Sequence, residues 1–289
     1  MELRQVRAFV TTADEGHVGR AATRLHVTQP TLSRQIAALE RAVAVPLFDR
    51  VGRRLELTPA GVVFLAGARE LVRRADQLVE ETRRAHRGEL GVLRIGFVQS
   101  ATFEALPRLV RDFGAVWPSV RVEVTAMTTL TQLSALADDR IDVGLLRPPV
   151  RAPDLALRTV SHDPLFAALP GGHPLAARQK VSLADLASEP FVLYGRASGP
   201  IVHDTIVSHC LAAGFSPRVV QEAVDVQTIV ALVAANLGVS LLIAPTPRTD
   251  ESAVVYRPLV EDLPPWEMAL AWSRHNQSPV LARLLETLS

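Results

Sequence analysis

The chain of 289 residues contains a single cysteine, Cys210, so it forms no internal disulfide. A lone thiol is typical of proteins that work in a reducing compartment. No uncharged apolar run reaches the roughly 18 residues that a membrane-spanning helix needs. Arg4, Arg7 and Asp14 also interrupt the start of the chain, where a secretory signal would need an apolar run. We therefore expect a cytoplasmic protein with no membrane partner.

The signatures of common enzymes and metal sites are missing as well. Lys180 is the only lysine, and the chain contains neither a phosphate-binding Walker loop nor a His-Glu-x-x-His zinc motif. The segment 195–199 misses the spacing of a nucleophile elbow by one residue. His203, His209 and Cys210 can share one helix face, but three ligands on one helix do not close a tetrahedral zinc site. We expect no enzyme activity, no metal and no cofactor.

Charge is divided unevenly along the chain, although the net charge is only +1. Residues 1–88 contain 15 arginines against 10 acidic residues, whereas the remainder holds 16 basic and 20 acidic residues. A basic first part favours a polyanionic partner such as nucleic acid, and the acidic remainder does not. The charge pattern therefore indicates two parts with different tasks.

The segment 18–39 has the pattern of two short helices joined by a tight turn. Thr28 suits the N-cap of the second helix and Pro30 its first turn. Apolar residues recur at helical spacing at Ala21, Ala22, Leu25, Leu32, Ile36 and Leu39. A helix-turn-helix, here beginning at Val18 and ending at Ala37, places its second helix in the major groove of double-stranded DNA. The alternative is a plain helical hairpin with a solvated polar face.

A short arginine-rich hairpin is expected at 51–57. Such a wing can lie along a phosphate backbone or reach the minor groove, where arginine is favoured. A solvated turn is the alternative. The residues expected to contact DNA are Gln29, Pro30, Thr31, Ser33, Arg34, Arg50, Arg53 and Arg54.

A long helix is expected to follow the hairpin. Thr58-Pro59 is typical of a helix start, and only Gly61 and Gly67 weaken the helical pattern up to about residue 87. Apolar residues between Val62 and Val79 recur at a three-four spacing and need a partner surface. A second copy of the chain is the simplest partner, because a two-fold dimer reads paired half-sites in DNA. Packing against the chain's own second domain is the alternative.

From residue 91 strands alternate with helices. Strands are expected at 92–98, 120–124 and 141–146, with helices at 103–113 and 130–137 between them, which predicts a parallel βαβαβ sheet. A second α/β unit is expected beyond Pro153. Its predicted elements are strands at 165–169, 191–194, 218–221 and 238–245 and helices at 203–213 and 226–235. A strand at 266–272 and a helix at 279–288 close the chain. Two such units leave a cleft, where ligands of α/β proteins bind.

Taken together, the order of these elements resembles the LysR-type transcriptional regulators over the whole chain. The resemblance is carried by Leu3 and Phe9, by Ala21, Ala22 and Leu25, by Thr28, Gln29, Pro30, Ser33, Ile36, Leu39 and Glu40, by 47–50 and by 57–61. It implies an α/β protein with an N-terminal all-α winged helix-turn-helix domain, a long linker helix and two Rossmann-like subdomains, similar to periplasmic binding proteins.

The expected domains follow from this resemblance. They are a winged helix-turn-helix domain at 1–58, a linker and dimerisation helix at 59–87, a hinge at 88–90, effector subdomain I at 91–161 with 267–289, and effector subdomain II at 162–266.

The resemblance also implies the function and the partners. We expect a homodimer or homotetramer that binds promoter DNA and regulates transcription in response to a small, anionic effector, with RNA polymerase as a further candidate partner. The alternative is a cytoplasmic ligand-binding module, or an enzyme of the same α/β fold, that uses its N-terminal part only to form oligomers. The arginine wing and the segment 29–34 favour the regulator.

Within the family, the segments 96–100, 127–129 and 142–147 look most like regulators of aromatic-compound degradation, which bind carboxylates such as muconate. The matching effector-binding positions are Ser100, Thr128, Thr129, Arg147, Pro200, Ile201 and Val202. Groups at strand ends and helix starts suit an anion, and Arg147 can form two parallel hydrogen bonds with a carboxylate. The alternative makes Ser100 and Thr129 plain N-caps and Arg147 a surface charge. The aliphatic Ile201 and Val202 indicate a more apolar effector than is usual in the family.

Overall fold

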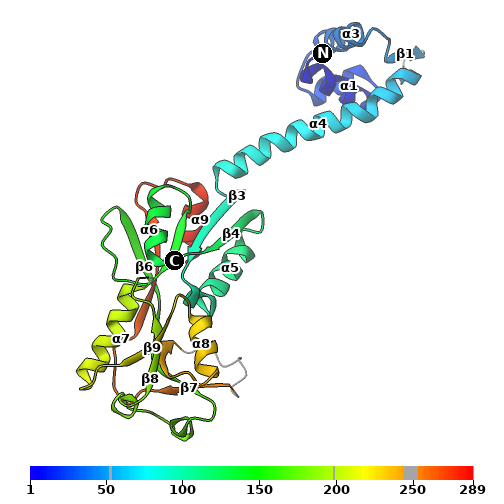
Figure 1. The fold of residues 1–289 in the computed structure, drawn as a ribbon. Helices are drawn as coiled ribbons and strands as arrows, with labels where there is room; N and C mark the ends of the chain where they lie inside the picture. The colour runs from blue at the N-terminus through cyan, green and yellow to red at the C-terminus, as the bar shows by residue number, and fades with distance from the viewer. Residues whose placement is uncertain (52–53, 198, 244–252, 289) are drawn as a thin grey trace. The chain divides into compact units, whose positions relative to one another are not determined.

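The computed structural model describes residues 1–51, 54–197, 199–243 and 253–288. Contacts within the chain divide it into two compact units, Met1–Arg84 and Ala85–Ser289 (Figure 1). None of the helices in the described residues is long and apolar enough to cross a membrane.

The first unit consists of helices and one antiparallel hairpin. Its elements are α1 (Leu3–Glu15), α2 (Val18–Arg24), α3 (Gln29–Val43), β1 (Phe48–Val51), β2 (Arg54–Leu57) and α4 (Pro59–His86). Phe9 is fully buried in its core, with its ring centroid 5.1 Å from that of Phe48 and 5.2 Å from that of Phe64. The aromatic cluster therefore holds α1, the hairpin and α4 together.

The start of α4 is fixed to the segment before the hairpin. The hydroxyl of Thr58 donates to Pro46 O at 2.9 Å and accepts from Gly61 N at 2.9 Å. A Cβ atom on Gly61 would lie 2.1 Å from Leu47 O, so only glycine allows this close approach. The sequence pattern at Thr58-Pro59 therefore marks both a helix start and a packing contact.

The apolar residues of α4 lie on two faces rather than in one stripe. Leu65, Ala68 and Val72 pack into the core of the first unit. Val63 and Leu78 belong to the other face and are 78% and 58% exposed. The prediction that the whole stripe seeks an external partner is therefore wrong for its inner half, because α1 already covers it.

The second unit begins with a mixed five-stranded sheet, subdomain I, in the order β4-β3-β5-β12-β6. Its strands are β3 (Gly91–Phe97), β4 (Val120–Ala126), β5 (Val143–Leu146), β6 (Leu155–Asp163) and β12 (Trp266–Ser273). Parallel pairing of β3 with β4 and β5 agrees with the predicted βαβαβ order. The helices are η1 (Gln99–Thr102), α5 (Ala105–Val116), α6 (Thr129–Ala137) and α9 (Pro279–Thr287), with α5 and α9 in one core cluster and α6 in another.

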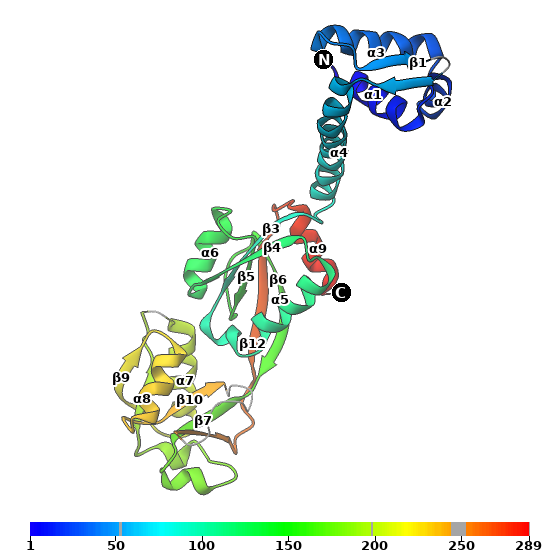
Figure 2. The same ribbon diagram turned by 90° about the vertical axis from the view of Figure 1, so that its right-hand side faces the viewer.

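The chain enters subdomain II after β6 and leaves it at β12, the two strands that cross over from subdomain I (Figure 2). Its strands are β7 (Leu165–Pro170), β8 (Pro190–Tyr194), β9 (Arg218–Ala223), β10 (Ser240–Ile243) and β11 (Val254–Pro258). Its helices are η2 (Pro174–Ala177), η3 (Ala184–Leu186), α7 (Pro200–Ala212) and α8 (Val226–Ala234). The helices α7 and α8 belong to different core clusters, so each covers its own side of the strands.

Two strands and the start of one helix differ from the sequence-based expectation. The strands β6 and β11 were not predicted, and both pair antiparallel with their neighbours. The helix α7 begins at Pro200 instead of His203. The last residues of the strand predicted at 238–245 lie outside the described residues.

The residues predicted to form a hinge pack against the last helix of the chain. Gly88 adopts a left-handed conformation with φ +72°, and a Cβ atom there would lie 2.3 Å from Pro279 O. Arg283 Nε donates to Arg87 O at 2.8 Å. The residues that follow α4 therefore pack against the N-terminal end of α9.

Candidate functional site

The first candidate site is the helix-turn-helix of α2 and α3. The two helices are joined by residues 25–28, and His26 takes a left-handed φ of 55° that reverses the chain direction. Leu32, Ile36 and Leu39 are buried against the rest of the first unit. The packing of this face leaves the opposite face of α3 exposed.

The exposed face of α3 carries the residues predicted to read DNA. Gln29, Pro30, Ser33 and Arg34 are exposed, and Thr31 is half-buried. The guanidinium of Arg34 has only long contacts to Pro30 O at 3.4 Å and Thr31 Oγ1 at 3.5 Å, so little restrains it. Thr28 occupies the N-cap position as expected, but its hydroxyl meets Thr31 Oγ1 at 2.9 Å instead of a backbone N–H.

The predicted wing is present as the hairpin of β1 and β2. Arg50 lies on β1 opposite Leu55, and Arg54 begins β2 opposite Val51. Arg53 lies outside the described residues. The Glu40 carboxylate of α3 accepts from Leu47 N at 2.8 Å, which ties the entry of the hairpin to the exposed helix. A hairpin beside the second helix is the arrangement of a winged helix-turn-helix domain.

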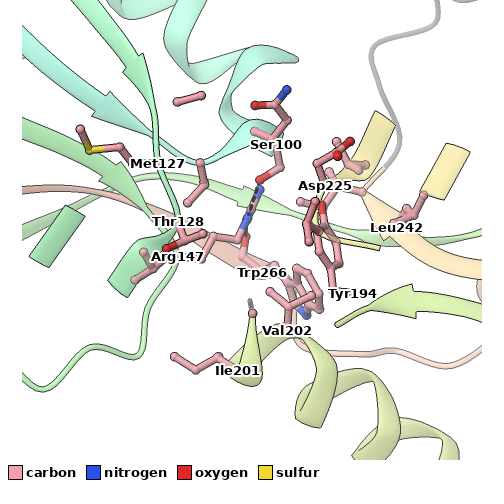
Figure 3. Close-up of a pocket in the computed structure, with 18 of the residues that line it drawn as sticks. Ser100, Met127, Thr128, Arg147, Tyr194, Ile201, Val202, Asp225, Leu242 and Trp266 are labelled. Atoms are coloured by element: carbon pink, nitrogen blue, oxygen red, sulfur yellow. Dashed lines mark hydrogen bonds between the residues drawn. The ribbon is translucent and has the colours of Figure 1, made fainter. Parts of the chain in front are cut away.

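The second candidate site is a cavity of about 330 Å³ between the two subdomains of the second unit. All seven predicted effector positions line it, namely Ser100, Thr128, Thr129, Arg147, Pro200, Ile201 and Val202. Figure 3 shows that the labelled lining residues come from both subdomains. The volume lies at the lower end of the range for small-molecule sites.

Helix starts from both subdomains surround this cavity. Thr128 caps α6 by accepting from Thr131 N at 3.2 Å, and Asp225 caps α8 by accepting from Thr228 N at 2.8 Å. No described side chain caps α7, whose first residues Pro200 and Ile201 line the cavity. The first N–H groups of a helix have no acceptor within it, so the start of α7 adds a partial positive charge to this wall.

Arg147 is the charged residue that departs most from its expected role. Its side chain is only 7% exposed, and Nη2 donates to Asp163 Oδ2 at 2.8 Å. Nε donates to Ser100 Oγ at 3.1 Å (Figure 3). Nη1 donates to the carbonyls of Trp266 and Glu267, both at 3.2 Å. The expectation that Arg147 offers two parallel hydrogen bonds to a carboxylate is therefore wrong, because the protein already uses these donors. The surface-charge alternative is wrong too.

The bonds of Arg147 also orient a hydroxyl in the cavity wall. Because Ser100 Oγ accepts from Arg147, its own O–H proton remains available to donate. The pKa of Arg147 is lowered by burial, and the hydrogen bond and charge of Asp163 oppose that change. Arg147 stays charged, since arginine does not lose its proton in proteins.

Much of the cavity wall was not predicted from the sequence. The unpredicted residues are mostly apolar and include Val98, Phe103, Met127, Leu130, Tyr194, Val224, Val226, Leu242, Ile243 and Trp266. Burial raises the pKa of Tyr194, so this side chain remains a neutral phenol. A usable signal existed for Asp225, which stands at a helix start after a strand, as Thr128 does. No such signal pointed to Trp266, because it reaches the cavity only through the crossing of β12 back to subdomain I.

A buried amide from α6 joins the end of β4 to β5. Gln132 Nε2 donates to Met127 O at 3.2 Å and to Leu145 O at 3.1 Å. A Cβ atom on Gly144 would lie 2.5 Å from Gln132 Oε1, so the glycine makes room for the amide. Gln132 thereby fixes the strand ends from which Thr128 and Arg147 extend.

Comparison with known proteins identifies the family. The family model for the bacterial regulatory helix-turn-helix protein, lysR family, matches residues 3–62, and the model for the LysR substrate binding domain matches residues 86–289. The HTH-type transcriptional regulator AlsR of Bacillus subtilis (strain 168) is 36% identical over 285 residues, which are 99% of this chain and 94% of AlsR.

Solved structures agree over the full length. The crystal structure of CbnR, a LysR family transcriptional regulator, matches with a TM-score of 0.89 at 29% identity and covers 100% of both chains. Full-length CbnR complexed with its target DNA gives 0.84 at 29% identity and covers 99% of this chain and 98% of CbnR. The predicted fold class, a helical helix-turn-helix domain followed by an α/β substrate-binding domain, is confirmed. The chain therefore belongs to the LysR family of DNA-binding transcriptional regulators.

Proposed function

We propose that this regulator binds promoter DNA through α3 and the wing and responds to a small effector in the cavity between its subdomains. The exposed groups of α3 and the arginines of the hairpin are the DNA contacts in this proposal. The observation that supports it most is that all the predicted effector residues line one and the same cavity. The ligand-module or enzyme alternative is not favoured, because the helix-turn-helix and the substrate-binding domain both match regulators.

The effector in this proposal is a compact carboxylate with an apolar body. The Ser100 hydroxyl and the uncapped first turn of α7 supply donors for the carboxylate. Apolar side chains such as Phe103, Met127 and Leu242 suit a ring or a short unsaturated chain. Products of aromatic-compound degradation are the first class to test.

Assembly of copies through α4 is also part of the proposal. The outward apolar residues of α4 are exposed in the single chain, and burial in a second copy removes them from water. A two-fold dimer presents paired helix-turn-helix elements to two half-sites, and pairs of dimers form the tetramer. RNA polymerase is the partner through which promoter binding acts on transcription.

Effector binding is proposed to change the arrangement of the two subdomains about the crossing strands β6 and β12. The connection at Gly88, seated on α9, passes that change to α4 and so to the spacing of the helix-turn-helix pairs. A ligand drives such a change only by binding the two arrangements with different affinity.

DNase I footprinting on the DNA upstream of its own gene and the divergent neighbour tests this function. We expect protection without ligand and a shortened or shifted footprint with benzoate or muconate. Protection that ignores every ligand would remove the effector role and keep the regulator. Absence of protection at low salt would refute DNA binding itself.

A further inference from the structure

We infer that the cavity accepts a ligand with no more than one carboxylate and discriminates against dicarboxylates of the same shape. The inference rests on the proposed function of the cavity as an effector site. It follows from how the charges around the cavity are already paired.

Two of the described lining residues are ionisable with a charge at neutral pH, Arg147 and Asp225. Asp225 is a carboxylate that accepts from Thr228 N and Thr228 Oγ1, both at 2.8 Å, and it repels a ligand anion. Arg147 is balanced by Asp163 at 2.8 Å. The described wall therefore holds no cation whose charge is left for a ligand.

The donors of Arg147 are also nearly used up. A guanidinium has five N–H groups. Four of them are in use, one each for Ser100 Oγ, Trp266 O, Glu267 O and the Asp163 carboxylate. The N–H that remains cannot form the two parallel bonds by which arginine grips a carboxylate. A ligand in the cavity therefore contacts Arg147 as part of an ion pair whose two charges already balance.

A second carboxylate would therefore enter the cavity without a cation to balance its charge. On the subdomain II side and at the crossing point, Tyr194 and Trp266 offer only neutral O–H and N–H donors and Leu242 offers none. Burial of a charge without a counter-ion is strongly unfavourable. A monocarboxylate avoids this cost because its other end is apolar. The arrangement thus sets an upper limit on ligand charge rather than on ligand shape.

The test compares ligands of equal shape and unequal charge by isothermal titration calorimetry on the full chain at pH 8. The pairs are trans,trans-2,4-hexadienoate with trans,trans-muconate, and benzoate with terephthalate. We expect each monocarboxylate to bind at least about tenfold more tightly than its dicarboxylate, the factor that one charge-assisted hydrogen bond supplies. Equal or tighter binding of either dicarboxylate overturns the inference, and so does the absence of binding by both monocarboxylates.

The variant Asp163→Asn tests the cause. It keeps a hydrogen-bond acceptor for Arg147 but removes the balancing charge, so muconate affinity should rise by about tenfold. Asp138→Asn is the matched control, because Asp138 pairs with Arg140 on the exposed surface away from the cavity. Muconate affinity that is unchanged in Asp163→Asn, or raised equally in both variants, contradicts the argument.

The outcome separates this inference from the proposed function. Muconate that binds tightly and shifts the DNA footprint leaves the regulator intact and refutes only the charge limit. A footprint that responds to none of the four acids, whichever of them bind, counts against the effector role instead.

Discussion

At the scale of single residues, Arg147 connects several elements of the second unit. It extends from the end of β5 and bonds to Ser100 of η1, to the start of β12 and to Asp163 at the end of β6. Those last two elements are the strands that cross between the subdomains. One guanidinium therefore joins a cavity-lining hydroxyl to both crossing strands, and its contact with the Trp266 ring, at 5.9 Å from the ring centroid, adds to the packing.

Replacement of this residue should weaken the whole second unit. Arg147→Leu leaves Asp163 mostly buried and unpaired, and we expect a loss of about 3 kcal/mol in the free energy of unfolding. Urea denaturation followed by circular dichroism measures the change. Arg147→Lys keeps the charge but loses the fork of donors, so an intermediate loss is expected. A loss below about 1 kcal/mol for Arg147→Leu, the level of an exposed pair, would contradict the structural role.

Arg34 is the side chain of α3 on which DNA affinity should depend most. Its guanidinium has only weak contacts within the protein, so Arg34→Ala leaves the fold intact and should cost about 1–3 kcal/mol in DNA binding. Fluorescence anisotropy over a range of salt concentrations measures it. Arg53→Ala should instead reduce the salt slope by about 1, as expected for a phosphate contact. Arg111→Ala, on an exposed part of α5, is the control. Unchanged binding in both variants would refute these assignments.

At the scale of elements, the strands that were predicted are those whose own residues are mostly apolar. The run 143–146 is buried throughout, and the core strands around it were located correctly. β6 escaped prediction because Arg158, Thr159 and His162 make it polar, and only pairing with β12 makes it a strand. The cavity shows the same division. Helix starts after strands identified Ser100 and Thr128, whereas Tyr194 and Trp266 reach the site only through the two crossings.

Two glycines of α4 should respond in opposite ways to the same substitution. Gly61→Ala places a methyl group 2.1 Å from Leu47 O, a backbone atom, and should destabilise the first unit by about 1–3 kcal/mol. Gly67→Ala meets nothing within 4 Å and should stabilise the helix by roughly 0.5–1 kcal/mol. Thermal unfolding of both variants measures the difference. Equal effects on the melting temperature would show that the contact at Leu47 does not constrain the helix.

At the scale of the whole molecule, assembly is expected to depend on the outer face of α4. Leu71 and Leu78 are seven positions apart, on one face, and are 45% and 58% exposed. The double variant Leu71→Glu with Leu78→Glu should dissociate the oligomer, because two carboxylates would be buried at the interface. Light scattering coupled to size-exclusion chromatography measures the mass. Leu211→Glu, an equally exposed position on α7, should leave the mass unchanged. An undiminished mass in the double variant would place the interface elsewhere.

The strand order of subdomain I also has a consequence for biosynthesis. β12 lies inside the sheet, between β5 and β6, yet it consists of residues 266–273, near the end of the chain. The sheet cannot close on the ribosome until nearly the whole polypeptide has been made. The helix-turn-helix unit is complete after its first 84 residues, so it can fold while the rest is still being translated. A nascent chain thus gains its DNA-binding part well before the part that senses the effector.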